Sequence, residues 1–583
     1  MKVSRVIIEN YRNLKHVDVR LEKIVTIIGE NNSGKSNFLR AITLPLSSED
    51  GASSSKRLTW YDFNREAKQE YYDYLTNNKD DILGGKISCE EFAEHLPIVS
   101  VQIDVSPEET EHYDIKNILF DDTEHWIGRI CYHFYPDRPA EIIELVKNIL
   151  KSESVDKDIY MSLLPTELYT YSIFVPGKNQ RIPYDVLSAF RSVVLSAERD
   201  NFASSADKLG SRALADALQK KLSSDAKVKI EKKYFEFFET VKTEGQMDKV
   251  LNWQDYSDIE CAKEFFEEIS IMPNMPPMSS IIGSVRLGYE DENMFMQGLG
   301  YRNLVLITVM LNSYLNGTGD YSLRLVTVEE PEAHLCNSNA LLTASLFQTI
   351  SVKAKRTQII YSTHSTEFVN KIGLDKVILF HNGVAINLEE NLSQAERDYL
   401  SANPNTDIFN LFYSRKAIMV EGFTEELFIK SYLQANPKLN DIKVFSFHKG
   451  FIRIIRIWKT LNKGTGNRLG IIRDFDDQPN AQQEHEKEIT DKVFVCTTKE
   501  YTLEPEIVGA GDNYTMLKEH YGDIYNWKSM TKQELSDDWR NNHKSEVMLK
   551  ICHDLVSGNL NGFTMPQHIQ SVLDSLQGDS DGN

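Results

Sequence analysis

Runs of apolar residues alternate with segments of helical spacing along most of the chain. Near the N-terminus, Ile24–Ile28 predicts a short buried strand, and helical spacing begins near Asn37. Leu323–Val328 and Thr357–Ser362 predict further buried strands, and Leu304–Leu315 predicts an apolar helix. Strands and helices that alternate in this way are typical of α/β domains, and an α/β fold is therefore predicted.

Residues 396–583 repeat the alternation, and two of their apolar runs end abruptly in acidic residues. Glu421 closes the first run, and Glu425 lies four residues later, so the two would share one face of a helix that begins here. Asp474 and Asp476 follow the second run at a spacing of two, which lets both point the same way at a strand end. Clustered carboxylate oxygens suit Mg²⁺ or Mn²⁺, the ions that serve phosphodiester chemistry.

Residues 205–275 interrupt the α/β pattern. They are rich in Ala, Lys, Glu and Leu and carry little turn chemistry before Pro273, so a helical insertion is predicted. An apolar face at three-to-four-residue spacing suits pairing with a second copy of the chain or, alternatively, packing on the chain's own neighbouring domain. The residues of this face are Leu209, Leu214, Leu218 and Leu222.

A glycine-rich loop lies between the first apolar strand and the first helix. Gly29–Ser36 matches the pattern G-x-x-x-x-G-K-S/T, in which backbone N–H groups cradle the phosphates of ATP. Lys35 would reach the β- and γ-phosphates, and the Ser36 hydroxyl would bind Mg²⁺. The predicted ATP-binding residues of the loop are Gly29, Asn32, Ser33, Gly34, Lys35 and Ser36.

Two later strands end in residues that would complete an ATP site. Leu325–Val328 is followed by Glu329, which would support Mg²⁺, and by Glu330, which would polarise the attacking water as a catalytic residue. His364 follows another strand and would sense the γ-phosphate. The alternatives stay open, because paired acids also cap strand ends and a lone histidine at a strand end usually has a structural role.

The order of phosphate loop, acids and histidine resembles ABC-type ATPases of the RecF and SMC kind. In those ATPases a signature segment contacts ATP across a dimer, and Gln297–Asn303 occupies its position here. The resemblance therefore implies a homodimer or a higher homo-oligomer. Ala333–Asn337 departs from the His-Leu-His-Pro that such ATPases often carry, which puts the local dimer contact in doubt but not ATP binding.

The order of Glu421 and then Asp474-x-Asp476 resembles the Toprim fold of primases, topoisomerases and nucleases. A phosphate-loop ATPase followed by Toprim resembles the OLD (overcoming lysogenization defect) ATP-dependent nucleases over nearly the whole chain. This resemblance implies a metal-binding set of Glu421, Glu425, Asp474, Asp476 and Glu504. It also implies a catalytic lysine, for which Lys544 is the candidate and Lys550 the rival, and Asp477 could substitute for a neighbouring acid.

The family resemblance implies an ATP-regulated, metal-dependent DNA endonuclease in prokaryotic antiphage defence, with a helicase-like or other defence partner. A two-metal mechanism would use Glu421, Asp474, Asp476 and Lys544 in catalysis. A topoisomerase or primase is a second interpretation, but no domain that supplies a tyrosine nucleophile is recognisable. A third is a DNA-bound ATPase scaffold that senses phage and controls a partner effector without cleaving DNA.

The predicted domains follow from these motifs. They are an ABC-type ATPase in two parts (1–204 and 276–395), a helical insertion with a role in dimerisation (205–275), a C-terminal Toprim α/β domain (396–575) and a disordered tail (576–583).

Charge and composition narrow the class of protein. The formal net charge of −21 argues against a generally basic DNA-coating protein. One basic segment, Lys220–Lys233, is either a local DNA contact or simply a solvated helix face. The six cysteines are scattered without Cys-x-x-Cys spacing, so no zinc site is expected. No apolar stretch approaches the roughly 18 residues of a membrane span, and a cytoplasmic protein is expected.

Overall fold

A computed structural model describes most of the chain, which divides into two compact units. The described ranges are residues 1–48, 56–107, 115–121, 126–178, 181–196, 221–246, 291–315, 321–403, 408–447 and 451–578, with scattered positions between 214 and 289. Unit 1 comprises Met1, Leu46–Ser54 and Tyr184–Ile359, and unit 2 comprises Lys2–Pro45, Ser55–Pro183 and Ile360–Asn583. In the described ranges, no helix is both long enough and apolar enough to cross a membrane.

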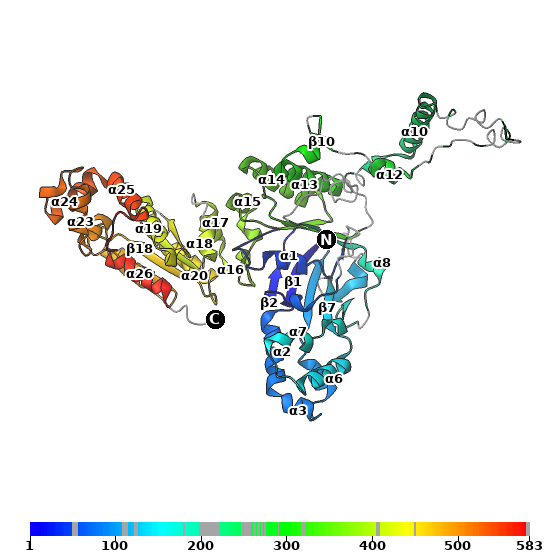
Figure 1. Cartoon of the computed structure of the whole chain (residues 1–583), viewed down its shortest axis with the longest axis horizontal. Helices are drawn as coiled ribbons and strands as arrows, with labels where there is room; N and C mark the ends of the chain where they lie inside the picture. Colours follow the sequence, from blue (N-terminus) through cyan, green and yellow to red (C-terminus); the bar gives the residue numbers. More distant parts are fainter. Residues whose placement is uncertain are drawn as a thin grey trace. The chain divides into compact units, whose positions relative to one another are not determined.

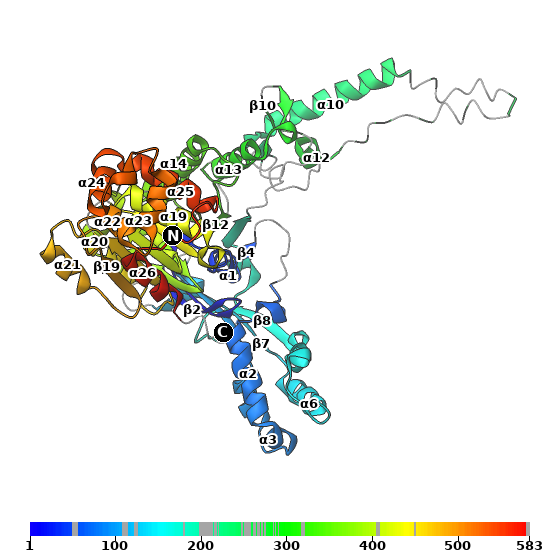
Figure 2. The same ribbon diagram turned by 60° about the vertical axis from the view of Figure 1, so that its left-hand side comes forward.

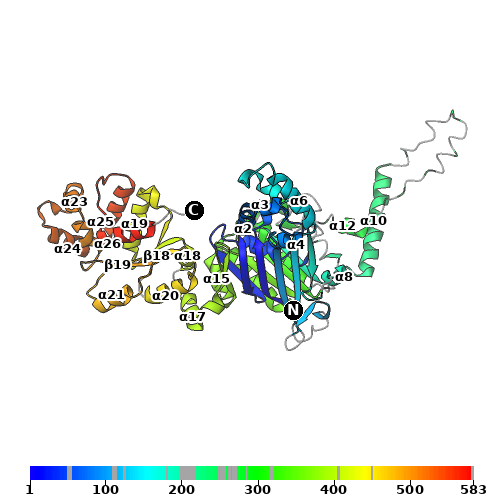
Figure 3. The ribbon, with the colours of Figure 1, turned by 90° about the horizontal axis from the view of Figure 1, so that it is seen from below.

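Unit 2 begins with an antiparallel sheet in the order β2-β1-β5-β7-β6, with β8 also paired to β7 (Figure 3). On β1, buried Val6 and Ile8 alternate with less buried neighbours, because one face of an antiparallel sheet packs on the core. Helices α2 (Arg65–Asn77), α3 (Lys79–Leu83) and α6 (Pro139–Leu150) lie together beyond this sheet (Figure 1). The strands are β1 (Lys2–Tyr11), β2 (Leu14–Arg20), β5 (Val99–Ser106), β6 (Leu119–Asp121), β7 (Ile127–Pro136) and β8 (Tyr169–Phe174).

The glycine-rich loop follows a buried strand of unit 2. Every residue of β3 (Ile24–Gly29) is buried, and β3 pairs in parallel with β14 (Val377–His381), where Phe380 lies opposite Gly29. β15 (Val384–Asn387) pairs with β14 in the antiparallel direction. The loop then runs into α1 (Lys35–Ala41), so the predicted strand–loop–helix order is confirmed.

The C-terminal part of unit 2 is built on a parallel sheet in the order β17-β16-β18-β19. Alternate residues of β16 enter two different cores, with Ile418 and Val420 in one and Ala417 and Met419 in the other. Both faces are therefore covered, which explains the unbroken apolar runs of the sequence. The strands are β16 (Lys416–Val420), β17 (Ile442–Ser446), β18 (Arg468–Arg473) and β19 (Val493–Thr497).

Helices from distant parts of the sequence cover the two faces of this parallel sheet. One core is lined by α19 (Phe423–Ala435), α25 (Lys544–Val556) and α26 (Gln567–Gln577) (Figure 1). The other core receives α18 (Ile408–Tyr413) and α20 (Phe451–Leu461), and it also contains Ile28 and Leu379 from the strands beside the glycine-rich loop. The packing of unit 2 is thus continuous from β3 to β16.

Unit 1 contains three parallel strands in the order β12-β9-β4, which are β4 (Ser47–Ser48), β9 (Phe190–Leu195) and β12 (Leu323–Glu329). Helices α13 (Leu299–Leu315) and α14 (Asn337–Lys353) pack on one another. The predicted apolar helix exists, but it begins at Leu299 rather than Leu304. β13 (Thr357–Ser362) crosses the boundary between the two units.

The predicted helical insertion contains α10 (Ser224–Glu244), which Figure 2 shows as one continuous helix. No residue of this described helix is buried, and Val228, Phe235 and Phe237 are exposed apolar side chains on it. Leu209 lies outside the described residues, whereas Leu214, Leu218 and Leu222 are half-buried. Dimerisation through this segment and the domain boundaries given above stay predictions, as does the disorder of the tail, of which residues 579–583 lie outside the described residues.

Gly470→Ala should destabilise the fold, because a methyl group at Gly470 on β18 would lie 2.3 Å from Val572 Cγ1 on α26. Overpacking a filled core costs about 1–3 kcal/mol, and urea unfolding followed by fluorescence would measure the loss in the free energy of unfolding. The double variant Gly470→Ala/Val572→Ala should recover part of that loss. Equal stability of Gly470→Ala and the parent protein would contradict this packing.

Candidate functional site

The acidic residues of the C-terminal domain gather at the carboxyl edge of its parallel sheet. β16 and β18 are neighbouring parallel strands, and Glu421 and Asp474 are the residues that follow their last positions. Because parallel neighbours end at the same edge, the two carboxylates lie close to one another. A hydrogen bond from the backbone N–H of Asp474 favours the charged form of Glu421. We call Glu421, Glu425, Asp474, Asp476 and Glu504 the acid cluster.

Two members of the acid cluster come from the first turns of helices. Glu425 lies in the first turn of α19 and Glu504 in the first turn of α22 (Leu503–Gly509), and both side chains are buried. A methyl group on Gly422 would lie 2.6 Å from Glu425 Oε2, so the carboxylate of Glu425 occupies the space that a side chain at position 422 would fill. The lack of a side chain at Gly422 therefore leaves room for that carboxylate.

Lys544 lies at the first position of α25 and contacts the acid cluster. Its Nζ atom is 3.2 Å from Oε1 of Glu504, whose side chain is 1% exposed. Burial lowers the pKa of Lys544, but Glu504, Glu425 and Asp474 outweigh burial, so the net shift is upward and the ammonium form is retained. Lys550 instead contacts Glu546, 3.4 Å away, and the ring of Tyr525. The structure therefore brings Lys544, and not its rival Lys550, to the acids.

Crowding of carboxylates shapes the electrostatics of the cluster. Burial, followed by the charges of Glu425, Glu421, Glu504 and Asp476, raises the pKa of Asp474 to about 8. Burial also raises the pKa of Glu421, although Arg473 opposes this shift. These acids repel one another where water screens them little, so the cluster favours the binding of cations or protons.

The turn that contains Asp476 and Asp477 has an uncommon backbone conformation. Asp476 has φ +48° and Asp477 has φ +53°, the left-handed region that aspartate tolerates better than most residues. The N–H of Asp476 donates to the carbonyl of Tyr501 at 3.2 Å, and the N–H of Phe475 donates to Thr498 Oγ1 at 2.9 Å. Asp476 is half-buried on this anchored turn, whereas Asp477 is exposed.

The cluster fits a divalent cation by its chemistry more than by its present geometry. In the described part of the chain, no three histidine, cysteine or acidic side chains stand close enough to enclose a metal ion. The donors are nevertheless all carboxylates, and Glu504 Oε2 has no hydrogen-bond partner among the described residues. Hard oxygen donors and unrelieved negative charge suit Mg²⁺ or Mn²⁺, and some side chains would have to rotate to coordinate the ion.

The glycine-rich loop of unit 2 has the backbone that a phosphate cradle needs. Gly29 has φ +151°, and a methyl group there would lie 2.3 Å from the carbonyl oxygen of Phe380, so only glycine fits. Gly34 has φ +116° and Asn32 has φ +62°. Lys35 is 6% exposed, and its Nζ donates to the carbonyls of Gly29 and Glu30 at 2.8 and 2.7 Å. Ser33 is buried and Ser36 exposed.

The predicted acids of the ATP site end a strand of unit 1. Glu329 is the last residue of β12 and is buried, and Glu330 follows it with φ +43°, a strained backbone for glutamate. Asn303 Nδ2 donates to the carbonyl of Ala333 at 3.3 Å, and a methyl group on Gly300 would lie 2.2 Å from the carbonyl oxygen of His334. The predicted signature segment thus packs on the turn after the acids.

His364 directly follows Thr363 after the end of β13, as predicted, and its side chain is exposed.

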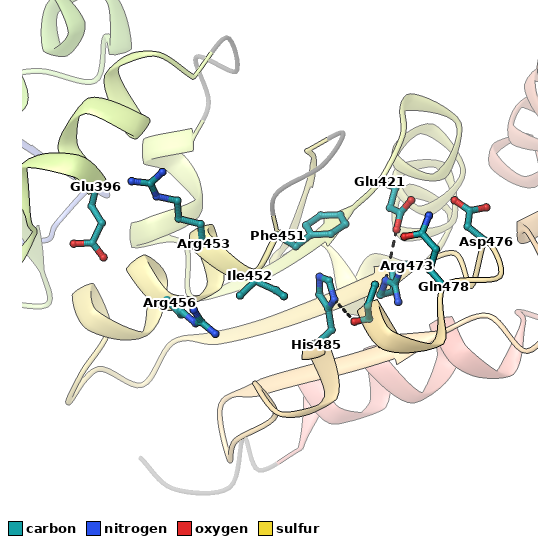
Figure 4. A pocket seen from close by; sticks show the side chains of 11 residues that line it. Glu396, Glu421, Phe451, Ile452, Arg453, Arg456, Arg473, Asp476, Gln478 and His485 are labelled. Carbon is teal, nitrogen blue, oxygen red and sulfur yellow. Dashed lines mark hydrogen bonds and ion pairs between the residues drawn. The ribbon is translucent and has the colours of Figure 1, made fainter. Parts of the chain in front are cut away.

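Arg473 is a residue of the candidate site that was not predicted, because it is the last residue of an apolar strand. Its side chain is 4% exposed, and its Nε atom lies 3.7 Å from Glu421 Oε1 (Figure 4). The sequence signal that could have identified Arg473 is its position directly before the paired acids Asp474 and Asp476.

Asp474→Asn should stabilise the metal-free protein at high pH. The folded state holds a proton on Asp474 that the unfolded chain releases above about pH 4, so this group's contribution to stability falls as pH rises from about 4 to 8. The variant should lack that fall and gain a few kcal/mol at pH 9, since one pKa unit is worth about 1.4 kcal/mol. Urea unfolding in EDTA at pH 5 and pH 9 measures this, with exposed Asp477→Asn as the control. Parallel pH profiles for parent and Asp474→Asn would refute it.

Comparison with known proteins gives a family and named relatives. The family model described as "AAA ATPase domain" matches residues 1–369. "Endonuclease GajA" of Bacillus cereus strain HuB5-5 is 22% identical over 549 residues, which cover 82% of this chain and 74% of that protein. "Endonuclease GajA" of strain VD045 is 21% identical over 445 residues, 74% of this chain and 68% of that protein.

Solved structures add a distant likeness. An SMC head domain bound to the C-terminal winged-helix domain of ScpA is 13% identical, covers 67% of this chain and 100% of its own, and gives a TM-score of 0.32. The predicted resemblance to ATPase–nucleases of the OLD kind is confirmed by the two GajA relatives together with the family match. Because that match spans well over half of the sequence, the chain belongs to the AAA ATPase domain family.

Proposed function

We propose that this protein is an ATP-regulated, divalent-metal-dependent DNA endonuclease that cleaves phosphodiester bonds in a C-terminal Toprim domain, residues 396–575. The observation that carries the proposal is the acid cluster, in which Asp474 lies among four other carboxylates with Lys544 beside them. The family match and the two relatives named as endonucleases support it. A role in antiphage defence and a helicase-like or other defence partner rest on the family resemblance alone.

The five acids of the cluster are the proposed ligands of Mg²⁺ or Mn²⁺. When bound, such ions make a hydroxide available near neutral pH and neutralise the leaving oxygen in phosphodiester hydrolysis. Lys544, held 3.2 Å from Glu504, would place its ammonium against the phosphate and offset the charge that develops there. Arg473, whose Nε lies 3.7 Å from Glu421 Oε1, would favour the charged form of that carboxylate.

The glycine-rich loop is the proposed ATP site. Its backbone N–H groups and Lys35 would hold the phosphates, and the exposed hydroxyl of Ser36 would reach Mg²⁺. Glu329 would support that ion, Glu330 would polarise water, and His364 would contact the γ-phosphate. Completion of ABC-type sites in trans makes a homodimer or larger assembly part of the proposal.

A second candidate is a DNA-bound ATPase that controls a partner effector without cleaving DNA. In such a protein the acid cluster would be retained for shape alone, and the intactness of all five acids argues against this. A plasmid-nicking assay with Mg²⁺ or Mn²⁺, with and without ATP, separates the two. Nicks without covalent protein–DNA linkage support the nuclease, and intact plasmid under every nucleotide supports the scaffold.

Asp474→Ala and Glu421→Ala should each lower the rate of plasmid nicking at least about 100-fold, because loss of one ligand removes several kcal/mol of transition-state stabilisation. Lys544→Ala should behave similarly, while Lys550→Ala, which removes the same charge from the same helix, should keep near-normal nicking. ATP binding measured by calorimetry should be unchanged in all four. Near-normal nicking by Asp474→Ala would remove the Toprim assignment.

Lys35→Ala should eliminate ATP binding, because its ammonium is the main side-chain charge opposite the β- and γ-phosphates. Lys15→Ala, which removes an exposed charge paired with Glu70, is the matched control. Glu330→Gln should still bind ATP but hydrolyse it slowly, since an amide polarises water poorly. Calorimetry and a phosphate-release assay measure the two effects. Wild-type turnover by Glu330→Gln would move the role to another acid.

A further inference from the structure

A cavity of about 650 Å³ opens beside the acid cluster, within unit 2. It runs from the end of β18 to helix α20, and Figure 4 shows its two ends. Glu421, Asp476 and Arg473 lie at one end, and Arg453 and Arg456 lie at the other. We call these the acidic end and the arginine end. None of these arginines was predicted to bind a ligand or act in catalysis.

Arg473 is a buried cation with unused hydrogen-bonding capacity. Its side chain is 4% exposed, and its Nε and Nη1 atoms have no hydrogen-bond partner among the described residues. Glu421, at 3.7 Å from Nε, is too far away for a hydrogen bond. A buried guanidinium that is left in this state costs free energy, which an anion in the cavity would recover.

Arg453 and Arg456 are three residues apart on α20 and therefore share a face of the helix. Arg456 is oriented by Glu488, with Nε 2.9 Å from Oε1, and Glu488 also accepts from Lys459. Arg453 donates to the carbonyl of Ala395 and lies over the ring of Tyr399. Both side chains remain exposed. They are thus preorganised but open to a ligand.

The remaining polar groups leave the arginine end cationic. The Glu396 carboxylate accepts hydrogen bonds from the N–H and the hydroxyl of Ser393, at 2.8 and 2.6 Å, as part of a helix cap. Burial lowers the pKa of His485, whose Nδ1 lies 2.7 Å from the carbonyl of Ala481, so the imidazole is neutral at pH 7. With Lys459 and Glu488 included, three cations therefore meet two carboxylates, and the arginine end keeps a net positive charge.

We infer that this cavity binds the nucleotide adjacent to the scissile bond of a DNA strand, with that nucleotide's phosphate on Arg453 and Arg456. The inference rests on the proposed nuclease function, because it places the scissile phosphodiester at the acidic end, beside Arg473. A volume of about 650 Å³ suits one nucleotide rather than a duplex. A strand, unlike a free nucleotide, would use both ends of the cavity, because consecutive phosphates require cationic groups in succession.

The test uses the full-length chain, fluorescein-labelled octathymidylate and fluorescence anisotropy in EDTA without ATP, at several salt concentrations. Arg453→Gln/Arg456→Gln should bind at least tenfold more weakly. Its plot of log affinity against log salt should be shallower by about 0.7, since the variant loses its contact with one phosphate of a single strand. The control Lys430→Gln/Lys528→Gln removes two exposed charges, each paired with an acid of the C-terminal part of the chain, and should match the parent protein. Unchanged affinity and slope in the arginine variant overturn the inference.

Competition distinguishes the two sources of a nucleotide phosphate. Thymidine 5′-monophosphate should displace the octamer only at concentrations far above those of unlabelled octamer, if the cavity serves a strand. Displacement at equal concentrations, lost in the arginine variant, would make the occupant a free nucleotide and overturn the strand assignment. Inorganic phosphate as the third competitor separates nucleotide recognition from simple anion binding, and equal potency with the octamer would also overturn it.

A plasmid-nicking assay distinguishes failure of this inference from failure of the proposed function. The arginine variant should show a raised KM for DNA with kcat close to that of the parent, because the substituted residues contact the strand away from the reacting atoms. A parent protein that binds the octamer through the arginines but never nicks DNA refutes the proposed function and not strand binding. A parent that nicks DNA, with a variant of unchanged KM and affinity, refutes only the cavity's role.

Discussion

Repulsion among carboxylates, two of them buried and three half-buried, is the constraint that governs the acid cluster. The parallel sheet brings Glu421 and Asp474 to one edge, and the first turns of α19 and α22 add Glu425 and Glu504. Like charges shielded from water cost free energy unless a cation or a proton offsets them. Lys544 offsets part of this cost, yet the raised pKa of Asp474 shows that the offset is incomplete. The fold thus maintains a site that is electrostatically unsatisfied by its own residues.

Two features of the backbone accommodate these charges. Gly422 leaves room for the Glu425 carboxylate, and the left-handed turn at Asp476 is anchored to the carbonyl of Tyr501. Arg473 lies on the cavity side of this arrangement, where its side chain is buried and its Nε and Nη1 atoms have no hydrogen-bond partner among the described residues. A guanidinium group with unused hydrogen-bond donors therefore lies beside a group of carboxylates. A phosphodiester has anionic oxygens, so it would need such a cation next to the acids.

The sequence predicted most of the elements that carry these groups, because strands covered on both faces appear as unbroken apolar runs. The acids were visible as the abrupt ends of such runs. The choice between Lys544 and Lys550 was not visible, because both lie on α25 and only the packing of that helix on α19 decides which one meets Glu504. Arg473 was missed for a related reason, since its contact with Glu421 depends on the pairing of two strands about fifty residues apart. Spacing along one strand carries no information about a neighbouring strand.

The core that contains Ile28 beside the glycine-rich loop also contains Met419 and Ile471 from the sheet that carries the acids. Close-packed interiors tolerate changes in side-chain volume poorly, so substitutions on one side of this core call for compensating substitutions on the other. An exchange of the C-terminal half of such a chain for a relative's by a cut at residue 396 alone would separate that half from the side chains against which its inner face is packed. Substitutions in the two parts of this core are therefore expected to accumulate together in related chains.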